Sequence, residues 1–284
     1  MVTDNINLPQ GNAVNFIEKL LKAARKNNSL LCVGLDPELM PPNMGIFEFN
    51  KKIIDATSDL VCAYKLNFAF YEALGSEGFD ILKQTVNYIT SDIAMIGDAK
   101  RGDIGSTAKA YAKAIFNNLN FDAATVNPYL GFDGVEPFTQ YRDKGVFILC
   151  RTSNPSAPDF QSLSYKTERK NYRLFELVAK KAAEWNKHAN IGLVVGATYP
   201  QELRLIRKNH PDMPLLIPGI GAQGGDLEQA VTYGVDAHGE KAIICSSRQI
   251  TYASRGDDFA KAARQVASEL RDEINSYRAN IASR

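Results

Sequence analysis

Short runs of apolar and β-branched residues recur eight times along the chain, and a segment with helical periodicity follows each of them. This alternation predicts parallel strands joined by crossover helices. A doubly wound open sheet and a closed barrel both satisfy such a pattern. The count of eight, with no break in composition that suggests a linker, favours a single α/β domain. We expect a (β/α)8 TIM barrel over residues 1–284, with an N-terminal helical extension.

The expected strands are short and largely apolar: Leu30–Leu35, Cys62–Leu66, Ile93–Asp98, Asp122–Val126, Gly145–Cys150, Ile191–Val195, Leu215–Ile217 and Ala242–Cys245. The helices expected to follow them are Phe49–Val61, Asp80–Thr90, Ser106–Asn117, Gly134–Tyr141, Thr167–Asn186, Pro200–Lys208, Asp226–Thr232 and Asp257–Tyr277. A segment rich in proline and serine, Asn154–Lys166, precedes the fifth helix, and it is either a lid or a surface excursion.

The charge balance limits the kinds of partner. With 33 basic and 32 acidic residues the net charge is +1, which gives no electrostatic signature of nucleic-acid or anionic-membrane binding. No apolar run reaches the roughly 18 residues of a transmembrane helix, and Met1–Asn12 lacks the basic and apolar regions of a signal peptide. We therefore expect a soluble, cytoplasmic protein that binds neither nucleic acid nor membrane.

Cysteine and histidine give no sign of a metal site. The 4 cysteines lie singly inside apolar runs, without a CxxC pair, and the 3 histidines lack metal-ligand spacing. We expect the thiols to be free and buried, where cysteine behaves as a small hydrophobic residue. A zinc enzyme or a cysteine–histidine hydrolase is therefore disfavoured.

Polar residues stand at or just past the ends of the expected strands: Asp36, Lys65, Asp98, Lys100, Asn127, Ser153, Gly219 and Arg248. In a barrel these ends converge on one mouth, where active sites lie. A polar residue after a strand can also simply begin a turn or cap a helix. Because so many share one rim, a functional site is the better interpretation.

The densest cluster of charged residues in the sequence lies at the end of the third expected strand and just after it. Asp98 and Lys100 are two residues apart on a strand, so their side chains should share a face, and Lys65 can reach the same place from the neighbouring strand. Asp103 follows in the turn before the helix. The alternative is a structural ion-pair network. Buried networks stabilise proteins poorly because desolvation offsets the pairing, so a catalytic cluster is favoured.

The segment at 98–105, DAKRGDIG, is similar to the D-x-K-x-x-D-I motif of the orotidine 5′-phosphate decarboxylase family. AYK at 63–65 and VGLD at 33–36 look like the lysine and ribose-binding aspartate elements of that family. The RG pair within the motif, LCRTSN at 149–154 and PGIGAQGG at 218–225 resemble its longer bacterial subgroup.

The resemblance implies a decarboxylation of orotidine 5′-monophosphate (OMP) to UMP and CO2, in pyrimidine biosynthesis, without metal or cofactor. It implies that Lys100 stabilises the carbanion at C6 and donates the proton, with Asp98 beside the substrate carboxylate. Lys65 would keep Asp98 ionised and contact the ribose, and Asp36 would accept hydrogen bonds from ribose hydroxyls.

The resemblance also implies a homodimer with shared sites, because the family residues that match Asp103 and Thr107 reach into the partner's site. For the phosphate, glycine-rich backbone and a guanidinium are suitable donors. Residues Gly219, Gly221 and Arg248 offer them, although glycine-rich turns are common and a lone arginine is usually solvated. By the same analogy, Ser153 hydrogen-bonds the pyrimidine and Gln223 bridges base and phosphate. Asn127 and Pro218 are expected to line the pocket.

Two other functions remain open. Metal-dependent decarboxylases and aldolases acting on sugar phosphates look similar around the motif, but they place an acidic metal ligand two positions before its first aspartate. Ile96 occupies that position here, which argues against Mg²⁺. The second alternative is a barrel that senses nucleotides without catalysis, which nothing specific in the sequence favours.

Overall fold

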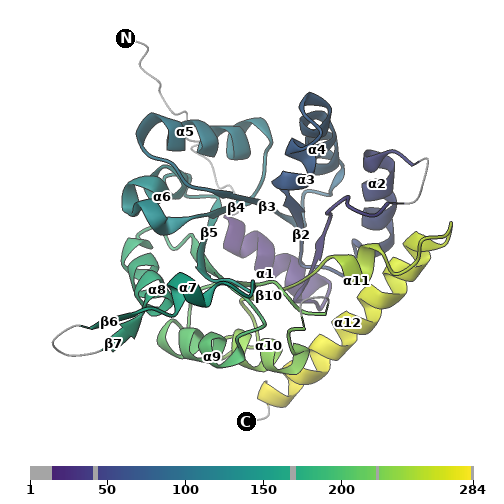
Figure 1. Cartoon of the computed structure of the whole chain (residues 1–284). Coiled ribbons are helices and arrows are strands. Elements are labelled where there is room, and N and C mark those ends of the chain that lie inside the picture. The colour runs from purple at the N-terminus through teal and green to yellow at the C-terminus, as the bar shows by residue number, and fades with distance from the viewer. Residues whose placement is uncertain (1–14, 41–43, 167–170, 222–223, 283–284) are drawn as a thin grey trace.

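Eight parallel strands form a closed barrel (Figure 1) in the computed structural model, which describes residues 15–40, 44–166, 171–221 and 224–282. The ring consists of β1 (Leu31–Gly34), β2 (Ala63–Asn67), β3 (Ala94–Arg101), β4 (Ala123–Val126), β5 (Gly145–Arg151), β8 (Ile191–Val195), β9 (Leu215–Ile217) and β10 (Ala242–Ser246). Pairing of Leu31 with Ile244 and of Cys32 with Cys245 closes it. The predicted single-domain (β/α)8 barrel is confirmed.

A layer of helices surrounds the barrel (Figure 1). The main helices are α2 (Ile46–Thr57), α4 (Ser76–Tyr88), α5 (Gly105–Lys113), α6 (Phe132–Thr139), α8 (Leu174–Trp185), α9 (Pro200–Asn209), α10 (Leu227–Gly234) and α12 (Phe259–Ala282). The strands they cover are almost wholly buried, as parallel strands with helices on one face and a filled barrel on the other must be. Within the described residues, no helix has the length and hydropathy needed to cross a bilayer.

Shorter elements lie in the segments between the strands and the main helices. They are α3 (Phe68–Glu72), the π-helical η1 (Ala114–Asn118), the 3-10 turn η2 (Pro128–Leu130), α7 (Pro158–Gln161) and α11 (Arg248–Thr251). The strands β6 (Ser164–Lys166) and β7 (Asn171–Arg173) form an antiparallel hairpin that projects from the barrel (Figure 1).

This hairpin corrects one boundary. The helix expected from Thr167 begins at Leu174, because residues 171–173 pair with 164–166 instead of joining the helix. The Glu176 carboxylate accepts a hydrogen bond from the Arg173 amide at 3.0 Å and fixes the helix start there. Residues 167–170 lie outside the described part of the chain.

Helix α1 (Phe16–Lys26) precedes β1 and closes the N-terminal end of the barrel. It is held by segments that lead into three different strands: the Phe16 amide donates to the Asp143 carbonyl at 2.9 Å, and Lys19 and Arg25 pair with Asp122 at 2.6 Å and Glu240 at 2.8 Å. The Phe16 ring lies so close to Gly145 that a Cβ at this glycine would come within 2.4 Å of it. Any larger residue at position 145 would displace the helix.

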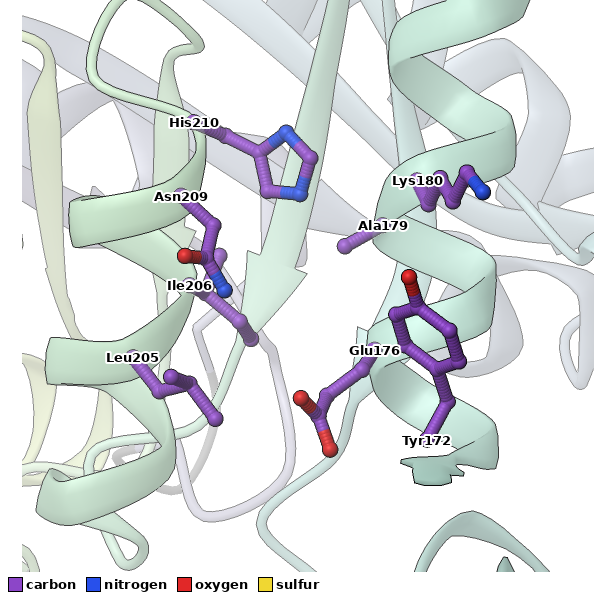
Figure 2. Close-up of a pocket in the computed structure, with 8 residues that line it drawn as sticks. All are labelled: Tyr172, Glu176, Ala179, Lys180, Leu205, Ile206, Asn209 and His210. Atoms are coloured by element: carbon purple, nitrogen blue, oxygen red, sulfur yellow. The ribbon is translucent and has the colours of Figure 1, made fainter. Parts of the chain in front are cut away.

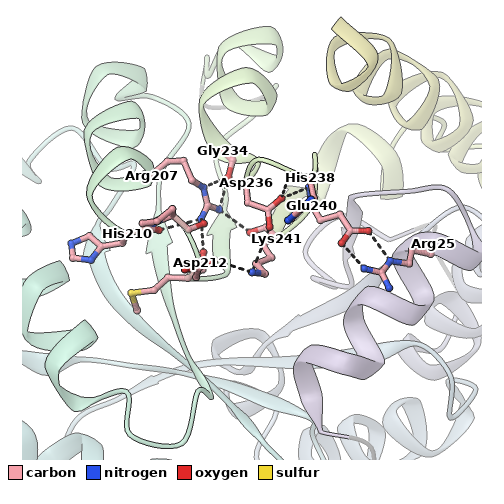
Figure 3. Close-up of polar contacts among 11 residues, drawn as sticks. Arg25, Arg207, His210, Asp212, Gly234, Asp236, His238, Glu240 and Lys241 are labelled. Carbon is pink, nitrogen blue, oxygen red and sulfur yellow. Dashed lines mark hydrogen bonds and ion pairs between the residues drawn. The ribbon is translucent and has the colours of Figure 1, made fainter. Parts of the chain in front are cut away.

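A buried arginine organises the same end of the barrel (Figure 3). The guanidinium of Arg207 donates hydrogen bonds to backbone carbonyls of the surrounding loops, those of Gly234 at 2.6 Å, Met213 at 2.7 Å, Pro211 at 2.9 Å, Lys241 at 3.1 Å and His210 at 3.3 Å. Burial lowers the pKa of Arg207 to about 10, which leaves it charged at neutral pH. One side chain thus satisfies the loops before β9 and β10.

We predict that Arg207→Met lowers the free energy of unfolding by about 2–4 kcal/mol, because several buried carbonyls lose their donor at once. Urea unfolding would measure this loss. Arg204→Met on the exposed side of the same helix is the matched control, since Arg204 lies over the Tyr233 ring instead of bonding buried carbonyls, and it should change stability by less than about 1 kcal/mol. Equal effects of the two variants would contradict this role of Arg207.

Candidate active site

A cavity of about 700 Å³ opens at the carboxyl ends of the barrel strands. It brings together many of the predicted site residues: Asp36, Lys65, Asp98, Lys100, Ser153, Pro218, Gly219 and Arg248. These side chains come from segments far apart in the sequence, and only the closure of the barrel makes them neighbours.

The carboxylate of Asp98 lies at the centre of the charged side of this cavity. One of its oxygens accepts hydrogen bonds from the Lys100 ammonium at 2.6 Å and the Thr125 hydroxyl at 2.9 Å, and the other accepts one from Lys65 at 3.1 Å. Asp98 and Lys65 are only 9% and 6% exposed. Both oxygens are therefore occupied by donors on the protein itself.

The two buried residues of this group, Asp98 and Lys65, are strongly held in their charged forms. Burial alone would raise the pKa of Asp98, but the neighbouring ammonium groups of Lys65 and Lys100 outweigh it and hold that pKa well below its usual range. Burial alone would lower the pKa of Lys65, but the carboxylates of Asp36 and Asp98 raise it well above its ordinary value. Fixed opposite charges in a poorly solvated cavity are therefore the ground state.

Asp36 continues the array on the other side of Lys65. Its carboxylate lies 4.0 Å from the Lys65 ammonium and accepts a hydrogen bond from the Asn67 amide at 3.3 Å. Tyr252 anchors the loop that carries Asp36, since its hydroxyl donates to the Asp36 carbonyl and accepts from the Glu38 amide. The result is a row of alternating charge, Asp36, Lys65, Asp98 and Lys100, along one wall.

The lining that follows β9 and β10 contains backbone and a guanidinium. Gly219 follows β9 with φ +100° and Gly221 has φ +72°, both in the region that favours glycine. Arg248 begins α11 directly after β10 and lines the same cavity. Gly221 belongs to this loop but not to the cavity lining, and Gln223 lies outside the described residues.

Ser153 is held in place by close packing and by a residue that the sequence did not reveal. A Cβ on Gly196 would lie 2.8 Å from the Ser153 backbone nitrogen, so only glycine permits this approach. The Gln161 amide accepts from the Thr152 backbone amide at 2.9 Å and donates to the Thr152 hydroxyl at 2.8 Å. Gln161 and Asn154 line the cavity, so the start of the segment 154–166 forms part of its wall.

Three further predicted residues are not part of the cavity lining. The Asn127 side chain accepts a hydrogen bond from the Tyr129 amide at 3.0 Å and caps η2, and it is not part of the cavity lining, so its place in the pocket stays a prediction. Asp103 accepts a hydrogen bond from the Ile104 amide at 2.8 Å, and Thr107 is exposed on α5. Neither of the last two lines the cavity of its own chain.

A second hollow, of about 170 Å³, lies between α8 and α9 on the outside of the barrel (Figure 2). Glu176 on α8 and His210 after α9 face it from opposite sides (Figure 2), and burial lowers the pKa of His210. None of its lining residues is shared with the cavity at the barrel mouth. The alternating charges therefore identify the larger cavity as the candidate active site.

A parallel (β/α)8 barrel with a row of alternating charges in the cavity at its mouth has the architecture of a barrel enzyme. Residues 29–266 match the orotidine 5′-phosphate decarboxylase / HUMPS family, and the chain belongs to this family. The resemblance seen in the sequence is thereby confirmed.

Individual relatives agree. The chain is 54% identical over 267 residues to the orotidine 5′-phosphate decarboxylase of Dehalococcoides mccartyi, covering 93% of this chain and 99% of that protein. The structure of Leishmania donovani OMP decarboxylase is similar with a TM-score of 0.83 at 39% identity, covering 94% of this chain and 100% of that one. Leishmania donovani UMP synthase is similar with a TM-score of 0.85 at 41% identity, covering 93% of this chain but only 57% of that one.

The depressed pKa of Asp98 predicts a stability that depends on pH. Its carboxylate stabilises the fold above the unfolded-state pKa of about 4, and this contribution is lost as the pH falls toward the lower folded-state pKa. Asp98→Asn should therefore be less stable than wild type by about 3 kcal/mol at pH 7, and the difference should shrink below pH 4. Urea unfolding at pH 7 and at pH 3 would measure both; a difference that is constant with pH would contradict the assignment.

Proposed function

We propose that this chain converts OMP to UMP and CO2 in pyrimidine biosynthesis, as a cytoplasmic enzyme that uses neither metal nor cofactor. The observation that supports this most directly is the row of Asp36, Lys65, Asp98 and Lys100 in the cavity at the barrel mouth. The relatives named above are decarboxylases of this substrate or, for UMP synthase, contain a matching region.

The difficulty of the reaction lies in the electron pair left at C6 when the bond to CO2 breaks, since the pair lies in the ring plane and the ring carbonyls delocalise it poorly. A fixed cation next to C6 stabilises this pair as it develops, without reorganisation at the moment of reaction. Lys100 supplies that cation, and its ammonium then transfers a proton to C6 to form the C–H bond of UMP. Its side chain is 48% exposed, so it can reach a bound nucleotide.

The neighbouring groups have supporting roles. Asp98 lies beside the substrate carboxylate and orients Lys100 through the 2.6 Å hydrogen bond. Lys65 keeps Asp98 ionised, and it shares the ribose with Asp36, whose carboxylate accepts from the sugar hydroxyls. Ser153 and Pro218 hold the pyrimidine, while Gly219 and Arg248 hold the phosphate with help from Gly221 and Gln223.

The donor set argues against a metal at this place. Both oxygens of Asp98 already accept hydrogen bonds from ammonium groups, and Ile96 is the residue two positions before it. Among the described residues, no three histidine, cysteine or acidic side chains gather as ligands. A divalent ion would have to displace Lys65 or Lys100 to bind Asp98, and the metal-dependent relatives on sugar phosphates are therefore the weaker analogy.

We predict that the purified protein consumes OMP, followed by its loss of ultraviolet absorbance, at the same rate before and after exhaustive EDTA treatment. Lys100→Ala should lower kcat by at least about a thousandfold, because it removes a charge needed only in the transition state. Lys181→Ala is the matched control: Lys181 is also 48% exposed and in an ion pair, at 2.7 Å from Glu184, but it lies on α8.

Three results would contradict the mechanism. A Lys100→Ala variant that keeps a tenth of the wild-type kcat would remove Lys100 from the chemistry. Activity that disappears with EDTA and returns with Mg²⁺ would assign the chain to a metal-dependent reaction instead. Binding of UMP without any turnover of OMP would support a nucleotide sensor.

We also propose a homodimer in which Asp103 and Thr107 complete the active site of the partner. Both lie outside their own cavity, and Thr107 is exposed on α5. Large apolar side chains surround this region and are unusually exposed: Ile104 at 56%, Tyr111 at 36%, Tyr129 at 87% and Leu130 at 48%. Such a patch beside the site is typical of a surface that another protein covers.

Subunit mixing tests this arrangement. Lys100→Ala and Asp103→Ala are each expected to be inactive, but a mixed dimer would contain one site with both lesions and one with neither. Random exchange makes about half of the dimers mixed, so roughly a quarter of wild-type activity should return if the sites are independent. If activity stays absent although native mass spectrometry confirms mixed dimers, Asp103 serves its own chain.

A further inference from the structure

The backbone of Lys100 is irregular in a way that affects where its side chain points. Lys100 has φ +47°, in the left-handed region that residues with a side chain seldom adopt. The pairing of β3 with β4 shifts register between Gly97 and Arg101, so Lys100 lies in a β-bulge. Bulges often occur next to active sites, where they redirect a side chain.

Thr125 on β4 compensates for this irregularity. A bulge leaves a backbone amide without its ladder partner, and here the Lys100 amide donates to the Thr125 hydroxyl oxygen at 2.9 Å. Regular pairing resumes one residue later, where the Asn127 amide donates to the Arg101 carbonyl at 2.7 Å. The hydroxyl thus takes the place of the missing strand-to-strand bond.

The same hydroxyl also fixes the carboxylate that holds Lys100. Because the hydroxyl oxygen accepts from Lys100, its single proton is directed to an Asp98 oxygen 2.9 Å away. That oxygen is the one that accepts from the Lys100 ammonium at 2.6 Å. Thr125, Asp98 and both nitrogens of Lys100 therefore form a closed ring of hydrogen bonds, and Thr125 is only 1% exposed.

We propose that Thr125 is a positioning residue for the decarboxylation: it holds the bulge and the Asp98 carboxylate so that the Lys100 ammonium faces the reacting carbon. This inference rests on the proposed function, in which Lys100 stabilises the carbanion and donates the proton. A hydroxyl is required because the ring needs one atom that accepts from an amide and donates to a carboxylate. Serine satisfies this requirement, and valine, which has nearly the same shape as threonine, does not.

The experiment compares Thr125→Val and Thr125→Ser with wild type by steady-state kinetics on OMP. The valine variant should lose about 10- to 100-fold in kcat, in line with loss of a hydrogen bond to a charged group, while KM changes less than about threefold. The serine variant should keep at least about a third of the wild-type kcat. If the valine variant does not fold, Thr125→Ala replaces it, and the same loss of kcat is expected.

Thr85→Val is the matched control. Thr85 is also a fully buried threonine whose hydroxyl accepts from one nitrogen, Asn50 at 3.1 Å, and donates to one oxygen, the Ile81 carbonyl at 2.9 Å. It lies on α4, away from the cavity. A general loss of a buried hydroxyl would affect this variant equally, so its kcat should remain within about twofold of wild type.

Hydrogen exchange at the Lys100 amide gives a readout that does not depend on turnover. In the valine variant this amide loses its acceptor and should exchange at least about tenfold faster, whereas the Asn127 amide, bonded to the Arg101 carbonyl, should not. A protein that does not decarboxylate OMP but shows this change would refute the proposed function and leave the positioning of Lys100 by Thr125 intact. In an active enzyme, an unchanged kcat in the valine variant would overturn the inference, whether or not the Lys100 amide exchanges faster.

Discussion

The interaction on which the site depends is the set of three hydrogen bonds that the buried Asp98 carboxylate accepts from Lys65, Lys100 and Thr125. A carboxylate with so little exposure stays ionised only where positive charge and donors surround it. Those donors belong to β2, β3 and β4, so the three strands must pair in order before the charge can be buried. The arrangement of charges in the site therefore depends on the pairing register of these three strands.

The two ends of the barrel differ in function: one contains the candidate site, and the other contains contacts that stabilise the fold. At the carboxyl ends, charges of both signs are held close together in a cavity, an arrangement that contributes little net stability because desolvation offsets the attraction. At the other end, α1 covers the barrel and Arg207 satisfies the carbonyls of several loops. The residues that stabilise the opposite end take no part in the site. The site can therefore contain buried charges that contribute little to the stability of the fold.

Much of the fold was predictable from local pattern, because a buried parallel strand must be a continuous apolar run and the chain contains eight of them. One helix boundary was predicted wrongly, because the local helical preference gave way to pairing with another strand. Residues 171–173 read as the start of a helix but pair with 164–166. Thr125 and Gln161 gave no signal, since a threonine in a strand and a glutamine in a loop are ordinary until their hydrogen-bond partners are known.

The sequence by itself determined the barrel and the family, because strand periodicity and the motif that contains Asp98 and Lys100 are local properties. Tertiary structure alone decided how those charges meet. The bulge at Lys100, the hydroxyl of Thr125 on the next strand and the wall contributed by Gln161 all follow from which backbone atoms lie opposite one another. Pairing across strands is a relation between segments, and no single segment encodes it.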